Sequence, residues 1–281
     1  MYFLFKLIEF IIYSMLVVLI TKNFLIKILR TLANTFNLDS KVVGDITGFA
    51  TSMPELISVC FTALAGMPVT IIYNILSSNI INAIQYIFSI FKNKNQKLLD
   101  NTALKIDIIM VIITILFPLM SIIFNIELNI GFVPIFIMLF ILFYLINRNT
   151  HKLYVPEIKT SVTVEIEEGN NNIKRNVAIK NIIYLIIVGI ALFIVGDMLG
   201  KIVKDLNEVF NLSEWVIGTI LGFITSIPEL ITFIESQRNS KKEENNIAGV
   251  VEATNNLLTS NIINLFVVMT IGIVIVYILQ V

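Results

Sequence analysis

Long apolar runs, separated by short polar segments, make up most of the chain. A run of about 20 apolar residues is long enough to cross a bilayer as a helix. We predict eight such helices, at about 2–21, 42–65, 68–91, 106–125, 129–147, 179–199, 214–235 and 247–280. The last run is long enough to span with a tilt or to contain a break. The pattern predicts an all-α polytopic membrane protein.

Composition supports this class. The 281 residues are 57% hydrophobic and 14% charged, whereas soluble domains carry roughly 25% charged residues. A net charge of zero gives no basis for a nucleic-acid partner, and a single cysteine, Cys60, excludes an intrachain disulfide. The first run lacks the small-residue cleavage site of a signal peptide and matches the run at 179–199, so we expect it to be a helix.

Positive charge predicts the orientation. Lys and Arg gather in the cytoplasmic loops of membrane proteins. With the N-terminus outside, 17 of the 20 Lys and Arg residues lie in cytoplasmic loops, and Lys6, Lys201 and Lys204 do not. The first helix then runs inward and the sixth, its counterpart, runs outward. The two halves therefore have inverted topology, as in many secondary transporters.

The hydrophilic stretch at 148–178 divides the chain. We expect residues 1–147 to form a first repeat of five helices, 148–178 a cytoplasmic linker and 179–281 a second repeat of three helices. Within the linker, 161–169 could form a short strand. His151, the single histidine, is expected to be a surface residue.

The two halves repeat one sequence. Residues 41–58 and 215–232 are identical at 11 of 18 positions, and 74–82 and 256–264 at 7 of 9. Each copy places a Pro-Glu pair inside an apolar helix, at residues 54–55 and 228–229. A duplicated, proline-broken helix that carries a carboxylate is typical of a transporter with internal repeats.

The Pro-Glu pairs indicate where an ion would bind. A carboxylate in the bilayer core costs several kcal/mol and is a candidate functional residue by default. Pro54 and Pro228 each remove a backbone donor and open the helix about one turn upstream. We expect this to free carbonyls near residues 50–51 and 224–225. Freed carbonyls at membrane depth are tolerated where they line a cavity.

Polar side chains at helical spacing surround the two glutamates. Positions three and four residues apart share a helix face, so each glutamate can share its face with the Thr-Ser pair before it, and the second block of each repeat forms a polar stripe. These residues are Glu55 with Thr51 and Ser52; Glu229 with Thr225 and Ser226; Asn74, Ser78 and Asn82; and Asn256, Ser260 and Asn264. Such an all-oxygen set suits Ca²⁺ or Na⁺, not zinc or copper. The alternative is a self-satisfied polar network without an ion.

Other repeated or charged residues have structural alternatives. The glycines at 44 and 48, and those at 218 and 222, are expected to let membrane helices approach closely. Asn79 and Asn261 lie off the stripes and are expected to form interhelical hydrogen bonds. Glu252 can cap a helix, face the cytoplasm or bind a cation. Asp45 has Thr219 as its counterpart and is expected to lie outside the symmetric site.

The motifs GFATSMPE and GFITSIPE, each followed by a Ser-Asn block, resemble the signature of the sodium/calcium exchanger family within the cation/calcium antiporter superfamily. The resemblance implies a transporter and not an enzyme. By this resemblance, the protein would reside in a cell membrane of prokaryotic type and have no resident cofactor. It would export Ca²⁺ in exchange for Na⁺ by alternating access. It also implies that the first and sixth helices slide across the core. The implied ion ligands are Glu55, Glu229, Thr51, Thr225, Ser52, Ser226, Ser78, Ser260, Asn82 and Asn264.

The chain departs from the family pattern in three ways. Ser77 and Thr259 replace the glycine of the Ser-Asn blocks, and Asn264 stands where some relatives carry Asp. The family's ten helices are reduced to eight. A homodimer that covers exposed helix faces, a naturally reduced subfamily and a truncated inactive product are the alternatives; the complete ligand set favours a working reduced form.

Alternative functions also remain. In Ca²⁺/H⁺ exchange, at least one glutamate would take up a proton. The chain could instead be a non-transporting cation-binding partner in the membrane. A channel is disfavoured because inverted repeats imply two alternating states.

Overall fold

The computed structural model describes residues 2–36, 38, 40–124, 126, 129–158, 171–240 and 247–280, and in these ranges it contains helices but no strand. The first half contains α1 Tyr2–Ile20, the π-helix η1 Thr21–Leu25, α2 Ile26–Thr35, α3 Ser40–Thr51, α4 Met53–Leu64, α5 Pro68–Asn93, the 3₁₀ helix η2 Gln96–Asp100, α6 Thr102–Ile123 and α7 Phe132–Ile158. The second half contains α8 Asn171–Glu208, α9 Glu214–Thr225, α10 Ile227–Ser240, α11 Ala248–Ile262, the π-helix η3 Ile263–Val268 and α12 Met269–Gln280. The prediction of an all-α protein is confirmed.

Within the described ranges, seven helices are long and apolar enough to cross a membrane. They are Tyr2–Leu32, Pro68–Asn93, Thr102–Ile123, Phe132–Asn149, Ile179–Glu208, Glu214–Arg238 and Ala248–Leu279. Each contains or overlaps one predicted span. The remaining predicted span, 42–65, corresponds to α3 and α4 together and is not among these seven helices. The residues that make this pair more polar than its counterpart include Asp45 and Thr47, where α9 has Thr219 and Leu221.

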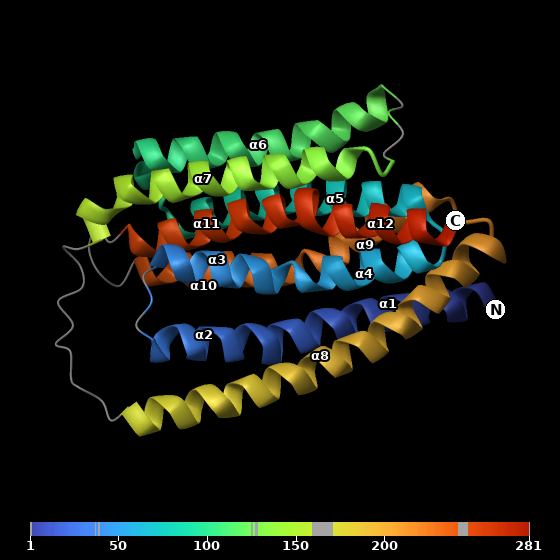
Figure 1. Ribbon diagram of the computed structural model, residues 1–281, viewed down its shortest axis with the longest axis horizontal. Helices are drawn as coiled ribbons and strands as arrows, with labels where there is room; N and C mark the ends of the chain where they lie inside the picture. The colour runs from blue at the N-terminus through green and yellow to red at the C-terminus, as the bar shows by residue number, and fades with distance from the viewer. Residues whose placement is uncertain are drawn as a thin grey trace.

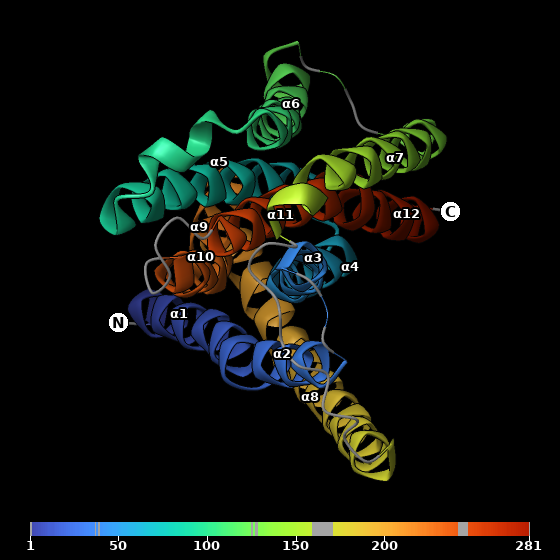
Figure 2. The same ribbon diagram turned by 90° about the vertical axis from the view of Figure 1, so that its left-hand side faces the viewer.

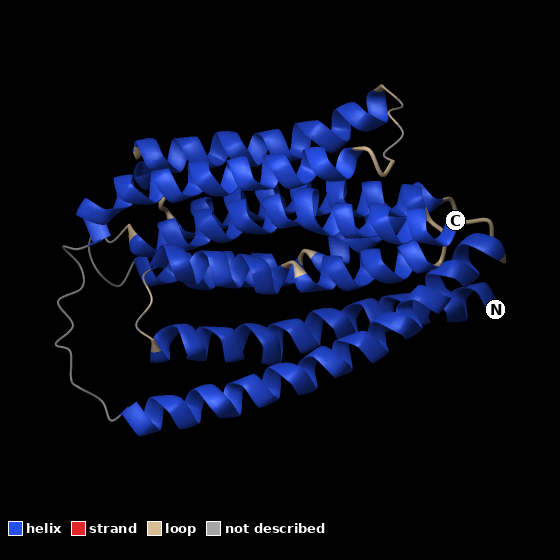
Figure 3. Ribbon diagram, in the orientation of Figure 1, coloured by secondary structure: helices blue, strands red, loops and turns tan. Residues whose placement is uncertain are grey.

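The helices run roughly along one long axis, with both chain ends at one end of the bundle (Figure 1). α1–α2 and α8 lie on one side, α6 and α7 lie on the opposite side, and the four repeated segments lie between them; the end view agrees (Figures 1 and 2). Those central segments are α3–α4, α5, α9–α10 and α11–α12. The break between α3 and α4 lies in the middle of the bundle, far from either end (Figure 3).

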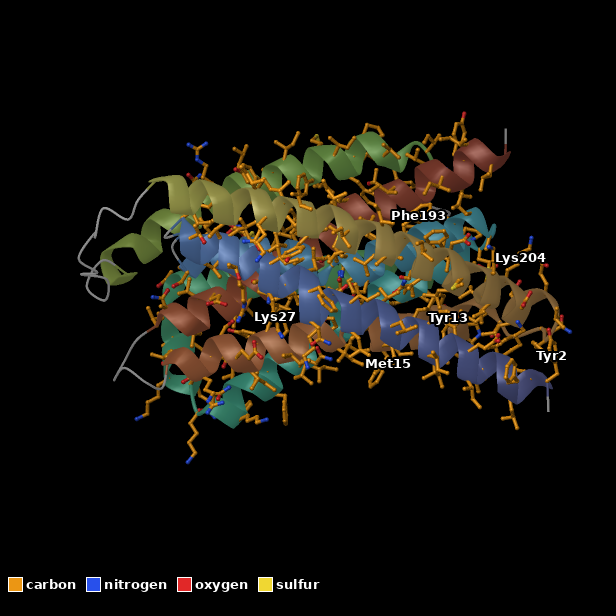
Figure 4. The ribbon with its side chains drawn as sticks, turned by 90° about the horizontal axis from the view of Figure 1, so that it is seen from below. Tyr2, Tyr13, Met15, Lys27, Phe193 and Lys204 are labelled. Carbon is orange, nitrogen blue, oxygen red and sulfur yellow. The ribbon has the colours of Figure 1, made fainter. Side chains whose placement is uncertain are left out.

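The outward face of α1 and α8 is apolar over its middle. Met15 and Phe193 project from this face, while Lys27 and Lys204 lie toward opposite ends of the bundle (Figure 4). Phe193 is 66% exposed. Exposed large apolar side chains over a helix face, with cations near the ends, are what a lipid-facing surface requires.

Glycines bring the central helices together in two equivalent pairs. A Cβ on Gly44 or Gly48 of α3 would meet the backbone of α11, at the carbonyls of Glu252 and Asn256. A Cβ on Gly218 or Gly222 of α9 would meet the backbone of α5 in the same way. The predicted packing role is confirmed, and each pair sets a Thr-Ser segment directly against the partner repeat's polar stripe.

Several helices extend further than hydropathy predicts. α1 continues through η1 into α2, so the first helical segment reaches Thr35 instead of residue 21. α2 carries Lys27, Arg30 and several uncharged polar residues, so it is not part of an uninterrupted apolar run. α7 reaches Ile158 and α8 begins at Asn171. The segment 161–169 lies outside the described residues, as does the side chain of His151.

Gly48→Ala is expected to lower the free energy of unfolding by about 1–3 kcal/mol, because the added methyl group would overpack a backbone contact. Its Cβ would lie 2.8 Å from the Asn256 carbonyl oxygen. The matched control is Gly189→Ala, where nothing lies within 4 Å of the new Cβ. Thermal unfolding in detergent compares the two variants. Equal melting temperatures would contradict the close-packing role of Gly48.

Candidate functional site

Both broken helices are interrupted at a serine, and the two serines occupy equivalent positions in the repeat. Ser52 separates α3 from α4 with φ −78° and ψ −2°, and Ser226 separates α9 from α10 with φ −79° and ψ 0°. Each serine hydroxyl donates back to a glycine carbonyl, Ser52 to Gly48 at 3.0 Å and Ser226 to Gly222 at 2.7 Å. The proline two residues later has no N–H to continue the hydrogen-bond ladder. Each break therefore opens the helix immediately before the glutamate.

Each glutamate sits in the first turn after its break and is fully buried, with 0% exposure for both Glu55 and Glu229. The Ser78 hydroxyl of α5 donates to Glu55 Oε1 at 2.5 Å. The Ser260 hydroxyl of α11 donates to Glu229 Oε1 at 3.0 Å. Each repeat thus supplies its own carboxyl with one hydroxyl donor.

Further hydroxyl contacts join the two repeats across the centre. The Ser78 and Ser226 hydroxyls lie 2.9 Å apart, and the Ser52 and Ser260 hydroxyls lie 3.0 Å apart. Thr51 crosses over too, since its hydroxyl donates to Asn256 Oδ1 of the other repeat at 3.3 Å. The hydroxyls beside each carboxyl are therefore linked to side chains of the other repeat.

A second set of equivalent contacts holds the backbone carbonyl of each glutamate. Asn74 donates to the Ser58 hydroxyl at 2.7 Å, and Ser58 donates to the Glu55 carbonyl at 2.9 Å. In the other repeat, Asn256 donates to Thr232 at 2.7 Å, and Thr232 donates to the Glu229 carbonyl at 2.9 Å. Ser58 and Thr232 are positioning residues outside the predicted set. Their equivalent places in the repeat, three residues after each glutamate, are the signal in the sequence that marks them.

Asparagines of α5 contact asparagines of α11 and of the π-helix η3 that follows it. Asn79 donates to the Asn261 carbonyl at 3.3 Å, and Asn261 donates to the Asn79 carbonyl at 3.2 Å, as predicted for interhelical hydrogen bonds. Asn82 donates to Asn261 Oδ1 at 3.1 Å, and Asn264 donates to Asn79 Oδ1 at 3.2 Å. With its nitrogen engaged, each of Asn82 and Asn264 has its amide oxygen left over.

Several buried oxygens at this centre lack a hydrogen-bond donor. A buried acceptor without a partner is costly and rare in a folded protein. Five lie on the repeated residues: Glu55 Oε2, Glu229 Oε2, Asn74 Oδ1, Asn82 Oδ1 and Asn264 Oδ1. With the glutamates ionised, all five are acceptors, and a cation placed among them would satisfy such oxygens.

This donor set fits a hard cation. Carboxylate, hydroxyl and amide oxygens are the ligands that Ca²⁺ and related ions take in proteins. Softer metals prefer nitrogen and sulfur, and none of the ten predicted ligands is a His or Cys. Direct contacts join seven of the ten predicted ligands in two groups: Glu55, Ser78 and Ser226, and Glu229, Ser260, Ser52 and Asn82. The other three hydrogen-bond residues outside the predicted set: Thr51 to Asn256, Thr225 to the Leu221 carbonyl and Asn264 to Asn79.

Two other buried acids have different surroundings. Asp45 accepts hydrogen bonds from Thr259 at 2.7 Å and from Asn255, and borders a cavity of about 210 Å³ between α3, α7 and α11. Asp107 of α6 is fully buried and interacts electrostatically with Tyr86. The sequence analysis did not consider Asp107, although an acid inside a predicted span was a visible signal.

Comparison with known proteins places these features in context. The family model described as sodium/calcium exchanger protein matches residues 6–148 and 180–281. The solved structure of the sodium-calcium exchanger NCX_Mj, soaked with Na⁺ and Sr²⁺, is similar with a TM-score of 0.53 and 21% identity over 97% of this chain and 83% of that chain. Comparison with the curated proteins gives no match. The structural likeness supports a shared fold.

Ser78→Ala and Ser260→Ala are each expected to weaken cation binding about tenfold, because each removes a hydroxyl beside a glutamate and a contact between the repeats. The Ca²⁺-dependent rise in melting temperature measures this effect. Ser121→Ala is the matched control, since that buried serine donates to the Phe117 carbonyl within α6, away from the centre. A wild-type Ca²⁺ response in both site variants would contradict the assignment.

Proposed function

Because this chain belongs to the sodium/calcium exchanger family, we propose that it moves Ca²⁺ across the cell membrane in exchange for Na⁺ by alternating access. The family consists of membrane transporters for cations, not enzymes. The described helices are those of a multi-pass membrane protein. Three parts of this statement are proposals: that the exchanged ions are Ca²⁺ and Na⁺, that their movements are coupled, and that the protein lies in the cell membrane.

One observation carries the proposal: two fully buried glutamates from opposite repeats lie at one centre, each with an oxygen that no donor satisfies. Two negative charges can neutralise one Ca²⁺. The proposed ion ligands are the carboxylates, the Thr-Ser pairs at the breaks, and the Ser and Asn residues of the two stripes. They are Glu55, Glu229, Thr51, Thr225, Ser52, Ser226, Ser78, Ser260, Asn82 and Asn264.

The arrangement of the repeats supports alternation. The contacts Ser78–Glu55 and Ser260–Glu229 are equivalent under the internal repeat, as are Ser78–Ser226 and Ser52–Ser260. In an inverted repeat, equivalent contacts point to opposite sides of the membrane. Exchanging the environments of the two halves would move access from one side to the other while the ligands stay the same.

The direct test is ⁴⁵Ca²⁺ uptake into proteoliposomes under an outward Na⁺ gradient and, separately, an outward H⁺ gradient. Uptake driven by Na⁺ is the expected result. Uptake driven by H⁺ alone would favour Ca²⁺/H⁺ exchange instead. Ca²⁺ binding without uptake under either gradient would favour a non-transporting cation-binding protein.

Glu55→Gln and Glu229→Gln are each expected to reduce Na⁺-driven uptake to the level of empty liposomes, because half of the site's negative charge is lost. Both variants should remain folded, since an amide has nearly the shape of the carboxyl and costs less to bury. Glu208→Gln, at an exposed glutamate near the end of α8, is the matched control and should transport normally. Near-normal flux in either site variant would refute the proposed site.

A homodimer forms a second part of the proposal. On α11–α12, Phe266 and Met269 are buried, Phe266 lying between Phe136 and Phe143 of α7. Their repeat counterparts on α5 are Ile84, 60% exposed, and the exposed Ile87. Because the equivalent face is covered by helices of this fold, we propose that a second copy of the chain covers the α5 face.

Ile87→Cys, in a Cys60→Ala background, is expected to crosslink two copies in the membrane. Ile137→Cys is the control, because Ile137 is similarly exposed on α7, which lies outside the proposed interface. Equal crosslinking at both positions would indicate random collision, and lipid would then cover the α5 face.

A further inference from the structure

Arg30 of α2 joins three helices at one end of the bundle. Its guanidinium donates to Glu252 of α11 at 3.0 Å, to the Ser236 hydroxyl of α10 at 3.2 Å and to Glu235 of α10 at 3.4 Å. Ser236 also donates to Glu252 at 2.6 Å. The Arg30 and Glu252 side chains are 25% and 14% exposed, so this ion pair is largely shielded from solvent. By the charge distribution of the loops, this end faces the cytoplasm.

The helix that carries Arg30 forms one unit with α8. Near the other end of the bundle, Lys6 of α1 pairs with Asp205 of α8 at 3.2 Å. α1 and α8 lie together outside the central helices in two views (Figures 1 and 2). Ile57 and Phe61 of α4 pack closely against the glycines at 196 and 200 of α8, so this contact between the unit and the centre is made by apolar side chains. The Arg30 cluster adds a polar, ion-paired fastening between the same two parts.

The outer end does not carry the same fastening. The repeat places Lys204 opposite Arg30, Thr62 opposite Ser236 and Thr70 opposite Glu252. Lys204 pairs with Glu208 of its own helix at 3.7 Å, and both side chains are more than half exposed. Thr70 instead contacts Glu214 of α9. The ion-pair fastening is therefore built into one half of a repeat whose central site is nearly symmetric.

We propose that Arg30 and Glu252 form a latch that holds the cytoplasmic side closed and biases the resting protein toward the state open to the outside. This inference rests on the proposed exchange by alternating access. Sliding α1–α2 and α8 across the centre would separate Arg30 from its partners, so the ion pair exists in one of the two states. An interaction made in one state alone shifts the equilibrium between the states.

The latch has a side-specific consequence. The apparent dissociation constant of an ion equals its intrinsic constant divided by the fraction of protein open to its side. A latch that lowers the inward-open fraction therefore raises the Ca²⁺ concentration needed for half-maximal transport from the cytoplasmic side. It does not raise the corresponding concentration on the outer side.

The test compares half-saturating Ca²⁺ for Na⁺-coupled flux in everted and right-side-out membrane vesicles. Glu252→Gln is expected to lower the cytoplasmic value by roughly fivefold or more, the usual scale of such coupling, and not to lower the outer value. The charge-reversed pair Arg30→Glu with Glu252→Arg should restore the original values. A parallel change on both sides, or no change on either, would overturn the latch.

Lys201→Met is the matched control. Lys201 pairs with Asp197 at 2.6 Å, but its side chain is 73% exposed and both residues lie on α8. Breaking this pair should change neither half-saturation value, because an exposed pair within one helix contributes little and does not join the two moving parts.

A measurement that needs no flux separates failure of the latch from failure of the proposed function. Lys27→Cys on α2 with Glu235→Cys on α10, in a Cys60→Ala background that keeps Arg30 and Glu252, should crosslink efficiently through a short bifunctional reagent in the resting protein and less efficiently when Glu252→Gln is added. Efficient crosslinking without any Ca²⁺ uptake would refute the exchanger and leave the closed contact established. Weak crosslinking would overturn the latch even in an active exchanger.

Discussion

The whole arrangement depends on keeping two carboxylates inside a protein interior that water does not reach. An unpaired charge in such a place costs several kcal/mol even after relaxation. Hydroxyl donors meet one oxygen of each carboxyl, from Ser78 and Ser260. The helix breaks at Ser52 and Ser226 turn the first turn of each glutamate helix toward the centre. What remains unsatisfied is acceptor oxygen, and the proposed cation would supply the missing positive charge.

Neither repeat can build this centre alone. The Ser226 hydroxyl contacts that of Ser78, and the Ser52 hydroxyl contacts that of Ser260. Glycine contacts bring α3 onto α11 and α9 onto α5, so these exchanges occur between repeats. Movement of one half therefore changes the surroundings of both carboxyls together. A binding site shared in this way links ion occupancy to the relative position of the halves.

Much of this could be predicted from the sequence because the repeat marks its own important positions. Apolar length identified seven spans, and the proline and glutamate pairs located the breaks within a residue or two. Contacts between segments far apart in the chain could not be predicted. Arg30 and Glu252 are separated by 222 positions, and their pairing depends on how α2 continues beyond the apolar run. The hydropathy pattern places Arg30 in a loop. A charged residue ends an apolar run even where the helix itself continues, as it does here to Thr35.

The π-helical turn at Thr21–Leu25 helps to set the direction in which the side chains of α2 point, because it lies between α1 and α2. A π-turn holds more residues than an α-turn, and each residue of an α-helix turns the next by about 100°. α8, the counterpart, is α-helical from Asn171 to Glu208. Deleting one residue between Tyr2 and Arg30 would leave the span nearly as long and as apolar. It would also rotate Arg30 by about 100° around the helix, away from Glu252. Insertions and deletions in this stretch are therefore constrained by side-chain direction, and substitutions that conserve hydropathy are tolerated there more readily than any change in residue count.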